Sequence, residues 1–269
     1  MYKLLATDMD GTLLNDNKEL SQEVIDSIKL AKSQNYKIVL CTGRSNMGIN
    51  QYINILKPDL VDYVISFNGS LIKETCRDET LIKWNLTKED LCYLDSLSKE
   101  LGLPIHFVSE TAIYTPNNPV GKYTVHEAFY TDMPIYQCEI SNLHEDIVIS
   151  KALLSGEKDK LSTQLQQLPK NFFDRFNGVK SGENYFEILN PQASKGNALK
   201  MLSEKLQIPS AEIIAIGDHE NDLSMIEFAG YGVSMGNAIE DVKKAADFVT
   251  NTNNENGVAV AMMRILKNN

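Results

Sequence analysis

The sequence predicts an α/β fold, in which a parallel sheet flanked by helices is interrupted by an inserted α+β module. At both ends of the chain, short apolar runs of strand length alternate with segments of helical periodicity, and this alternation is typical of a parallel sheet. The middle of the chain follows a different order of strands and helices. We therefore expect one discontinuous core domain, residues 1–84 and 190–269, and an inserted domain, residues 85–189.

The N-terminal segment predicts strand, helix, strand, helix, strand. Leu4-Leu5-Ala6 begins the first strand, and Ser21 is a candidate N-cap for a helix that ends near Asn35. A second strand, residues 37–41, leads into Thr42-Gly43-Arg44. The remaining elements are a helix over residues 45–56, stopped by Pro58, and a strand over residues 61–67 that leads into Asn68-Gly69-Ser70.

The inserted segment begins after a hairpin over residues 71–84. A helix over residues 87–101 has Leu91, Leu94 and Leu97 on one face. No assignment follows from the pattern for residues 117–140. The other expected elements are strands over residues 105–108, 112–115, 147–154, 172–176 and 185–189, and a helix over residues 158–168.

The parallel pattern returns near residue 190. Ser194 is a candidate N-cap for a helix with an apolar row at Leu199, Leu202 and Leu206. Residues 213–216 form the most apolar strand and lead into Gly217-Asp218-His219-Glu220-Asn221-Asp222. The chain then predicts a helix over 223–228, a strand over 231–234, a helix over 238–246, a strand at 248–249 and a helix over 258–266.

Asp8 and Asp10 follow the first strand. Residues two apart in extended chain point the same way, so both carboxylates can face one spot, and Gly11 lets the backbone approach a ligand closely. Two carboxylates on one spot favour a cation between them, or a proton on one of them. One could then act as nucleophile and the other as general acid. Taken alone, the pair could also be a turn former or a helix cap.

Other polar residues are expected at the same sheet edge, because ligands bind at the carboxyl ends of parallel strands. Taken singly, Thr42-Gly43 could be a simple turn, Lys195 a solvated lysine, and Asp218 and Asp222 helix caps. Taken together, so many charges at one edge would be costly without a metal and a phosphate to organise them. A lysine at a helix start is unfavourable by itself, whereas a phosphate bound there would explain it.

Composition limits the partners and the compartment. The net charge of −10, with 36 acidic and 26 basic residues, argues against nucleic acid or an anionic membrane as the main partner. We find neither a signal peptide nor an apolar run of membrane-spanning length. The four scattered cysteines have no metal-like spacing and indicate reduced thiols, so we expect a cytoplasmic protein.

The joint pattern resembles the haloacid dehalogenase (HAD) superfamily, and its order and spacing resemble the Cof-type subfamily. The motifs are Asp8-Met9-Asp10-Gly11-Thr12, Thr42-Gly43-Arg44, Lys195-Gly196 and Gly217-Asp218-His219-Glu220-Asn221-Asp222. The subfamily often has Gln or Ser at the position of His219. The resemblance covers essentially the whole chain and implies a Rossmann-like core with an inserted cap of the C2B type.

The resemblance implies a Mg²⁺-dependent phosphatase that acts on small phosphorylated metabolites, sugar phosphates first, through an aspartyl-phosphate at Asp8, with Asp10 as general acid and base. Transport ATPases of the superfamily have Thr at the position of Asp10, so an acid there favours rapid turnover. A hexose phosphomutase and a non-catalytic phosphosugar-binding regulator remain alternatives, and the oligomeric state is not predicted. The implied metal site comprises Asp8, Asp10, Asp218 and Asp222, and the implied phosphate site comprises Thr42, Gly43, Arg44, Lys195 and Asn221.

Overall fold

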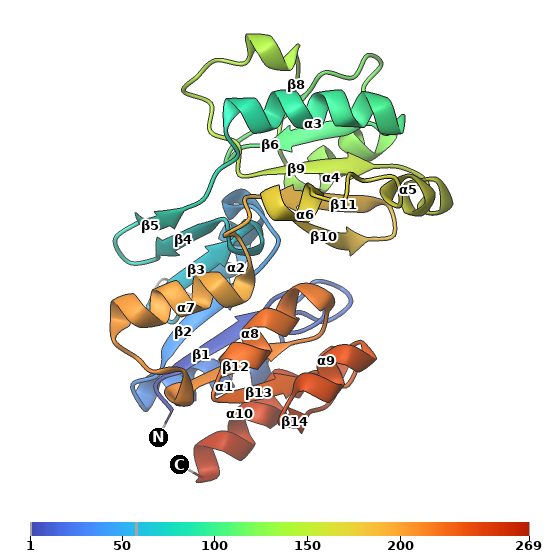
Figure 1. The fold of residues 1–269 in the computed structure, drawn as a ribbon. Coiled ribbons are helices and arrows are strands. Elements are labelled where there is room, and N and C mark those ends of the chain that lie inside the picture. The colour runs from blue at the N-terminus through green and yellow to red at the C-terminus, as the bar shows by residue number, and fades with distance from the viewer. Residues whose placement is uncertain (1, 57–58, 269) are drawn as a thin grey trace. The chain divides into compact units, whose positions relative to one another are not determined.

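The computed structural model describes residues 2–56 and 59–268, which form two compact units (Figure 1). The first unit contains Met1–Gly43, Asn50–Lys83 and Ser194–Asn269, and the second contains Arg44–Ile49 and Trp84–Ala193. These units are defined by contacts alone, so the predicted domain limits stay a prediction. Pro58, the expected stop of a helix, lies outside the described residues.

The first unit is built on an eight-stranded sheet in the order β14-β13-β12-β1-β2-β3-β4-β5. Strands β14 to β3 are parallel, and β4 and β5 form an antiparallel edge hairpin. Every residue of β1 and β12 is buried, as expected for central parallel strands covered on both faces. The strands are β1 Leu4–Asp8, β2 Lys37–Cys41, β3 Tyr63–Ser66, β4 Leu71–Glu74, β5 Glu79–Lys83, β12 Ile213–Gly217, β13 Tyr231–Ser234 and β14 Phe248–Val249.

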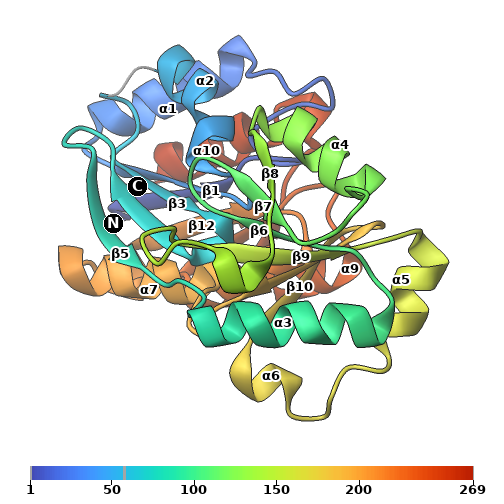
Figure 2. The ribbon, with the colours of Figure 1, turned by 90° about the horizontal axis from the view of Figure 1, so that it is seen from above.

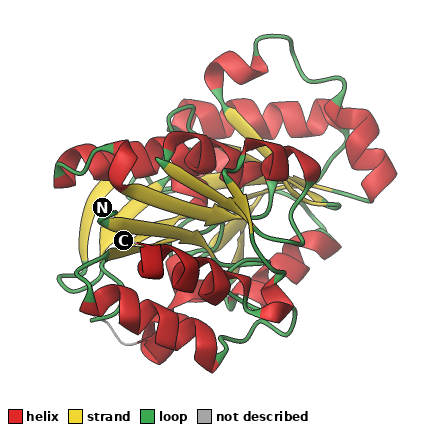
Figure 3. Cartoon of the chain, turned by 90° about the horizontal axis from the view of Figure 1, so that it is seen from below, coloured by secondary structure: helices red, strands yellow, loops and turns green. Residues whose placement is uncertain are grey.

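Helices lie on both faces of this sheet (Figure 3). Helix α1 packs against α10, whereas α7 packs against α8 and α8 against α9. Ser21 and Ser194 cap α1 and α7 as predicted, because each hydroxyl accepts a hydrogen bond from the backbone N–H three residues on. The helices are α1 Gln22–Ser33, α2 Asn46–Leu56, α7 Lys195–Leu206, α8 Leu223–Phe228, α9 Glu240–Ala245 and α10 Gly257–Asn268.

The second unit is a six-stranded sheet in the order β10-β11-β9-β6-β7-β8, antiparallel except for the pair β7 and β8 (Figure 2). Thr87 and Asp90 form a capping box at the start of α3, whose buried leucines join the core of the unit. Its elements are α3 Lys88–Leu101, β6 Ile105–Val108, β7 Ile113–Thr115, α4 Lys122–Thr131, β8 Ile135–Gln137, β9 Lys151–Ser155, α5 Lys158–Leu165, α6 Phe172–Arg175, β10 Asn177–Gly182 and β11 Tyr185–Leu189.

One predicted strand of the inserted segment is wrong. Residues 172–176 were expected to be extended, but Phe172–Arg175 is the short helix α6. Phe172 and Phe176, four residues apart, are both buried, whereas Phe173 is 60% exposed. A spacing of four residues places both side chains on one buried face of a helix. The strand was predicted because aromatic residues are also frequent in strands. Helix α4 and strand β8 fill part of the unassigned stretch, and β10 was not predicted.

Together these observations confirm the predicted α/β class with a parallel-rich sheet. Among residues 2–56 and 59–268, no helix has both the length and the apolar character needed to cross a membrane.

Candidate active site

Three of the predicted site residues of the first unit lie where parallel strands end. Asp8 is the last residue of β1, Thr42 follows β2, and Asp218 follows β12. Strand β1 pairs in parallel with both β2 and β12, so these three ends meet at one edge of the sheet. This is the edge at which open α/β sheets bind their ligands.

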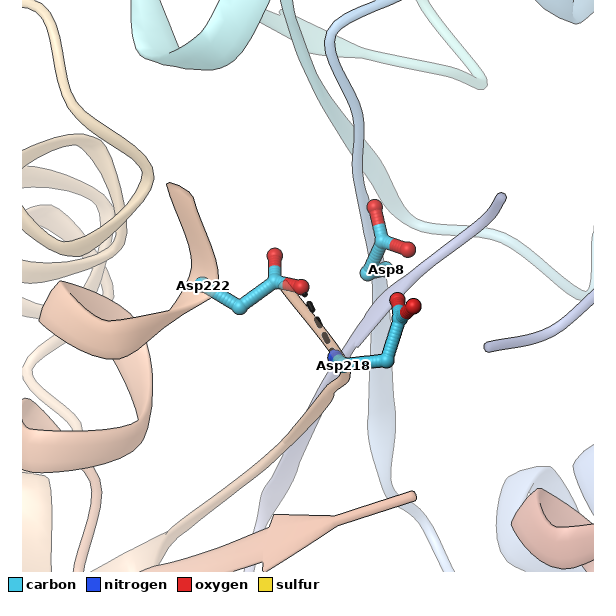
Figure 4. A group of neighbouring side chains, drawn as sticks. All are labelled: Asp8, Asp218 and Asp222. Carbon is cyan, nitrogen blue, oxygen red and sulfur yellow. Dashed lines mark hydrogen bonds between the residues drawn. The ribbon is translucent and has the colours of Figure 1, made fainter. Parts of the chain in front are cut away.

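Three carboxylates come together at this edge. Asp8, Asp218 and Asp222 each offer an oxygen, and these oxygens lie within 4.8 Å of one another (Figure 4). The Asp218 backbone N–H donates to Oδ2 of Asp222 at 2.9 Å, and the His219 N–H donates to the same oxygen at 3.0 Å. Asp222 is therefore fixed by the turn that it helps to close.

Lys195 is the buried cation of the group. Its Nζ donates to Oδ1 of Asp8 at 2.5 Å and to Oδ1 of Asp222 at 2.6 Å. The side chain is fully buried, although it extends from the first residue of α7. A buried ammonium is stable only when it is paired, and here the two carboxylates supply the compensating charge.

Burial has the largest effect on the pKa values of the charged residues in this group. Desolvation raises the pKa of Asp8 well above its usual range, and Asp222 and Asp218 add to the rise while Lys195 opposes it. Desolvation and then Asp222 raise the pKa of Asp218 to about 6. Desolvation lowers the pKa of Lys195, but the charges of Asp222 and Asp8 outweigh it, so that pKa is raised. The carboxylates therefore outnumber the positive charge available to them.

Gly11 and Thr12 hold Asp218 from the side of the first motif. The Thr12 hydroxyl donates to Oδ1 of Asp218 at 2.9 Å. Gly11 has φ +78°, and a Cβ atom there would lie 2.5 Å from Oδ2 of Asp218. Only glycine combines this backbone conformation with so close an approach to a carboxylate.

A second set of polar contacts surrounds the end of β3. Asn68 is buried in a left-handed conformation (φ 53°), and its backbone N–H donates to the Thr42 carbonyl at 2.9 Å. Asn221 donates from Nδ2 to Oδ1 of Asn68 at 2.9 Å. A Cβ atom on Gly43 would lie 3.1 Å from the Asn68 amide. The motif containing Thr42 and the motif containing Asn221 are thus joined through Asn68.

The family follows from the comparison with known sequences. A family model described as haloacid dehalogenase-like hydrolase matches residues 5–262. The chain belongs to this family. It is 43% identical over 269 residues to "Putative phosphatase YxeH" of Bacillus subtilis, covering 99% of each chain. It is 31% identical over 264 residues to "5-amino-6-(5-phospho-D-ribitylamino)uracil phosphatase YcsE" of the same organism, covering 97% of this chain and 94% of the relative.

Solved structures agree with this family assignment. A haloacid dehalogenase-like hydrolase from Bacteroides thetaiotaomicron is 34% identical, with a TM-score of 0.86, and the match covers 98% of this chain and 100% of the other. The family and the named relatives identify the chain as an enzyme, a HAD-type phosphatase with a small phosphorylated substrate.

Two of the predicted site residues of this HAD phosphatase have contacts away from the acidic group. Asp10 pairs through Oδ1 with Nζ of Lys18 at 2.9 Å, and its side chain is 35% exposed. Arg44 belongs to the second unit, where it donates to the Gly48 carbonyl at 3.2 Å and its guanidinium lies 5.8 Å from the centre of the Tyr130 ring. The predicted roles of both residues stay predictions.

Several residues that contact the site have no role predicted from the sequence. Thr12 lies within the motif that begins at Asp8, and its hydroxyl was a signal from which a contact with the site could have been predicted. Lys18 and Asn237 carried no sequence signal, because each approaches the site through a loop. Asn237 donates from Nδ2 to the Gly11 carbonyl at 2.8 Å and lies 3.5 Å from Oδ2 of Asp218.

Proposed function

We propose that this HAD phosphatase is a Mg²⁺-dependent phosphomonoesterase that forms an aspartyl-phosphate on Asp8. The observation that carries the proposal is the cluster of Asp8, Asp218 and Asp222, in which the buried Lys195 pairs with the buried Asp8 and Asp222. Phosphoryl transfer of this kind requires three parts: a nucleophilic carboxylate, a cation beside it, and oxygen ligands for a metal.

The donor set fits a hard divalent cation. All the groups are oxygens, the ligands that Mg²⁺ prefers, and the raised pKa values of Asp8 and Asp218 indicate negative charge in need of a cation. Asp222 already accepts three hydrogen bonds, so we assign it a supporting part in which it orients Lys195 and the turn at Asp218. Asp8, Asp218 and the carbonyl of Asp10 would hold the ion, which supplies positive charge beside the phosphoryl oxygens.

In the first step, an oxygen of Asp8 attacks phosphorus. The new Asp8 O–P bond forms as the ester O–P bond breaks, and Asp10 donates a proton to the departing oxygen. In the second step, Asp10 takes a proton from water while that water's oxygen attacks phosphorus. The bond between Asp8 and phosphorus then breaks, and inorganic phosphate and free Asp8 are restored.

The remaining residues position the phosphoryl group. Lys195 holds Asp8 in place and offsets charge that develops around phosphorus. Thr42 and the Gly43 backbone would donate to phosphoryl oxygens, and Asn221, held by Asn68, would support them.

For the substrate, we propose small phosphorylated metabolites, with sugar phosphates first. The name of the relative YcsE points to a related class, since its substrate is the phosphate of a ribityl chain. Hexose 6-phosphates and pentose 5-phosphates likewise carry their phosphate on a primary alcohol. The location proposed for the protein is the cytoplasm, where its free cysteines would stay reduced.

Phosphate release from a panel of phosphorylated metabolites, with Mg²⁺ and with EDTA, tests this function. The panel includes hexose and pentose phosphates, 5-amino-6-(5-phospho-D-ribitylamino)uracil, flavin mononucleotide and pyridoxal phosphate. We expect metal-dependent release that favours a few polyol or sugar phosphates. Exchange of phosphate between two positions of a hexose without release would favour a mutase, and binding without any turnover would favour a regulator.

A further inference from the structure

Lys18 is placed to control the side chain proposed as general acid and base. Its Nζ lies 2.9 Å from Oδ1 of Asp10, and both side chains are partly exposed. We infer that Lys18 is a positioning residue that holds the Asp10 carboxylate in the orientation needed for proton transfer. This inference rests on the proposed function, because it concerns the proposed role of Asp10.

The backbone of Lys18 is fixed by a tight turn. The Lys18 N–H donates to the Asn15 carbonyl at 2.9 Å, and the Asn15 N–H donates to the Glu19 carbonyl at 3.1 Å. The Asn15 side chain accepts from the Glu19 N–H at 2.9 Å. From outside the turn, the hydroxyl of Tyr52 donates to the Lys18 carbonyl at 3.1 Å.

Asparagine side chains fasten the same loop to the C-terminal part of the first unit. Asn253 donates from Nδ2 to the Leu14 carbonyl and to Oδ1 of Asp16, both at 3.0 Å. Asn237 donates to the Gly11 carbonyl at 2.8 Å and accepts from the Asn253 N–H at 2.9 Å. The backbone on both sides of Asp10 and Lys18 is thus held in one arrangement.

The conformation of Lys18 supports a role for its side chain. Its φ is 62°, in the left-handed region, where glycine or asparagine fits with less strain. Lysine occupies this position although glycine would fit the backbone with less strain, and its ammonium group reaches the Asp10 carboxylate.

The ion pair of Lys18 and Asp10 is well suited to orienting the Asp10 carboxylate. An exposed ion pair contributes little to stability, because the entropy lost when its side chains become ordered offsets the attraction. Here the turn already fixes the backbone of Lys18, so less conformational freedom is lost when the ion pair forms. Lys18 engages Oδ1 of Asp10, so in this inference Oδ2 is the oxygen that carries the transferred proton. Without the contact to Lys18, the Asp10 side chain would sample several rotamers. Few of these rotamers place Oδ2 within reach of the departing oxygen.

Comparing two substrates with different leaving groups distinguishes a positioning role of Lys18 from a merely structural one. We would measure kcat/KM for an alkyl phosphate and for 2,4-dinitrophenyl phosphate, whose leaving group needs no protonation. In Lys18→Met we expect about a tenfold loss with the alkyl phosphate and less than about a twofold loss with the dinitrophenyl ester. Lys18→Arg, which keeps the charge, should recover most of the alkyl activity.

Lys29→Met is the matched control, because Lys29 is another exposed lysine in an ion pair, with Asp26 at 3.0 Å. It should leave both rates unchanged. Equal losses on the two substrates in Lys18→Met, or no loss on either, would overturn the inference. If Asp10→Asn is as active as the wild type, or the wild type releases no phosphate, the proposed function itself fails and this inference with it.

Discussion

Nζ of Lys195 lies 2.5 Å from Oδ1 of Asp8, and both side chains are buried in the first unit. The same ammonium group also reaches Asp222, so one buried cation pairs with two buried carboxylates. A carboxylate held in this way is fixed in direction. In the proposed mechanism, Asp8 in this state attacks phosphorus without first losing a shell of water.

Removal of the buried cation should affect stability and activity together. Lys195→Met leaves Asp8 and Asp222 without their shared partner, so the free energy of unfolding should fall by about 3 kcal/mol. Phosphate release should fall at least about 100-fold, because the charge beside phosphorus is also lost. Urea unfolding in EDTA and a phosphate-release assay measure the two effects.

Lys151→Met is the control for this variant. Lys151 is a buried lysine of the second unit, and its Nζ lies 2.9 Å from Oε1 of Glu187. This variant should lose a similar amount of stability but retain turnover in the fraction that stays folded. Similar activity losses in both variants would mean that Lys195 acts only through folding.

A side chain at Gly11 should damage the metal site. In Gly11→Ala the new methyl group would lie 2.5 Å from Oδ2 of Asp218 and strain a backbone with φ +78°. We expect Mg²⁺ affinity to fall at least about tenfold. Isothermal titration with Mg²⁺ checks this result.

Gly102→Ala separates strain from steric contact. Gly102 also has a left-handed backbone (φ +60°), but a Cβ atom there meets nothing within 4 Å. This variant should lose about 1 kcal/mol of unfolding free energy and bind Mg²⁺ as the wild type does. Normal Mg²⁺ binding by Gly11→Ala would show that Asp218 does not hold the ion as proposed.

His106 should make stability depend on pH. It is fully buried on β6, its Nδ1 contacts the Thr124 hydroxyl of α4, and burial followed by the charge of Lys151 lowers its pKa to about 3. Between pH 6.5 and 3 the unfolded chain therefore binds a proton that the folded chain does not. The stability contributed by the neutral imidazole is complete above pH 6.5 and declines as the pH falls.

The expected change is about 2 kcal/mol of unfolding free energy lost from this group at pH 5. The neighbouring Glu127 on α4 and Glu187 on β11 pair with Lys151, so the comparison must isolate the histidine. Chemical unfolding of the wild type and of His106→Gln at pH 7 and pH 5 does so. An equal pH dependence in the two proteins would refute the assignment.

Local sequence signals predicted the parallel sheet of the first unit well. Apolar runs such as residues 213–216 are buried on both faces, so their pattern survives in any arrangement of neighbours. The polar residues after Asp8 and Gly217 could be placed at one edge because parallel strands share a direction. The helix caps at Ser21 and Ser194 depend on contacts three residues apart and were predicted for the same reason.

What the sequence could not show depends on contacts between distant segments. The pairing of Lys18 with Asp10 requires the turn at Asn15, and the contact of Asn237 with Gly11 joins residues far apart in the chain. In the second unit, a short aromatic segment ending at Phe176 satisfied a strand pattern as well as a helical one. Its neighbours in the core decided between the two.

The most direct test of the account is the covalent intermediate on Asp8. Asp10→Asn, which lacks the base for the second step, would be mixed with a good substrate and Mg²⁺, quenched in acid within the first turnover, digested and analysed by mass spectrometry. We predict a phosphoryl group on the peptide that contains Asp8, and neither label nor turnover in Asp8→Asn. Phosphate release by Asp8→Asn at the wild-type rate, or turnover with no labelled peptide, would contradict the mechanism.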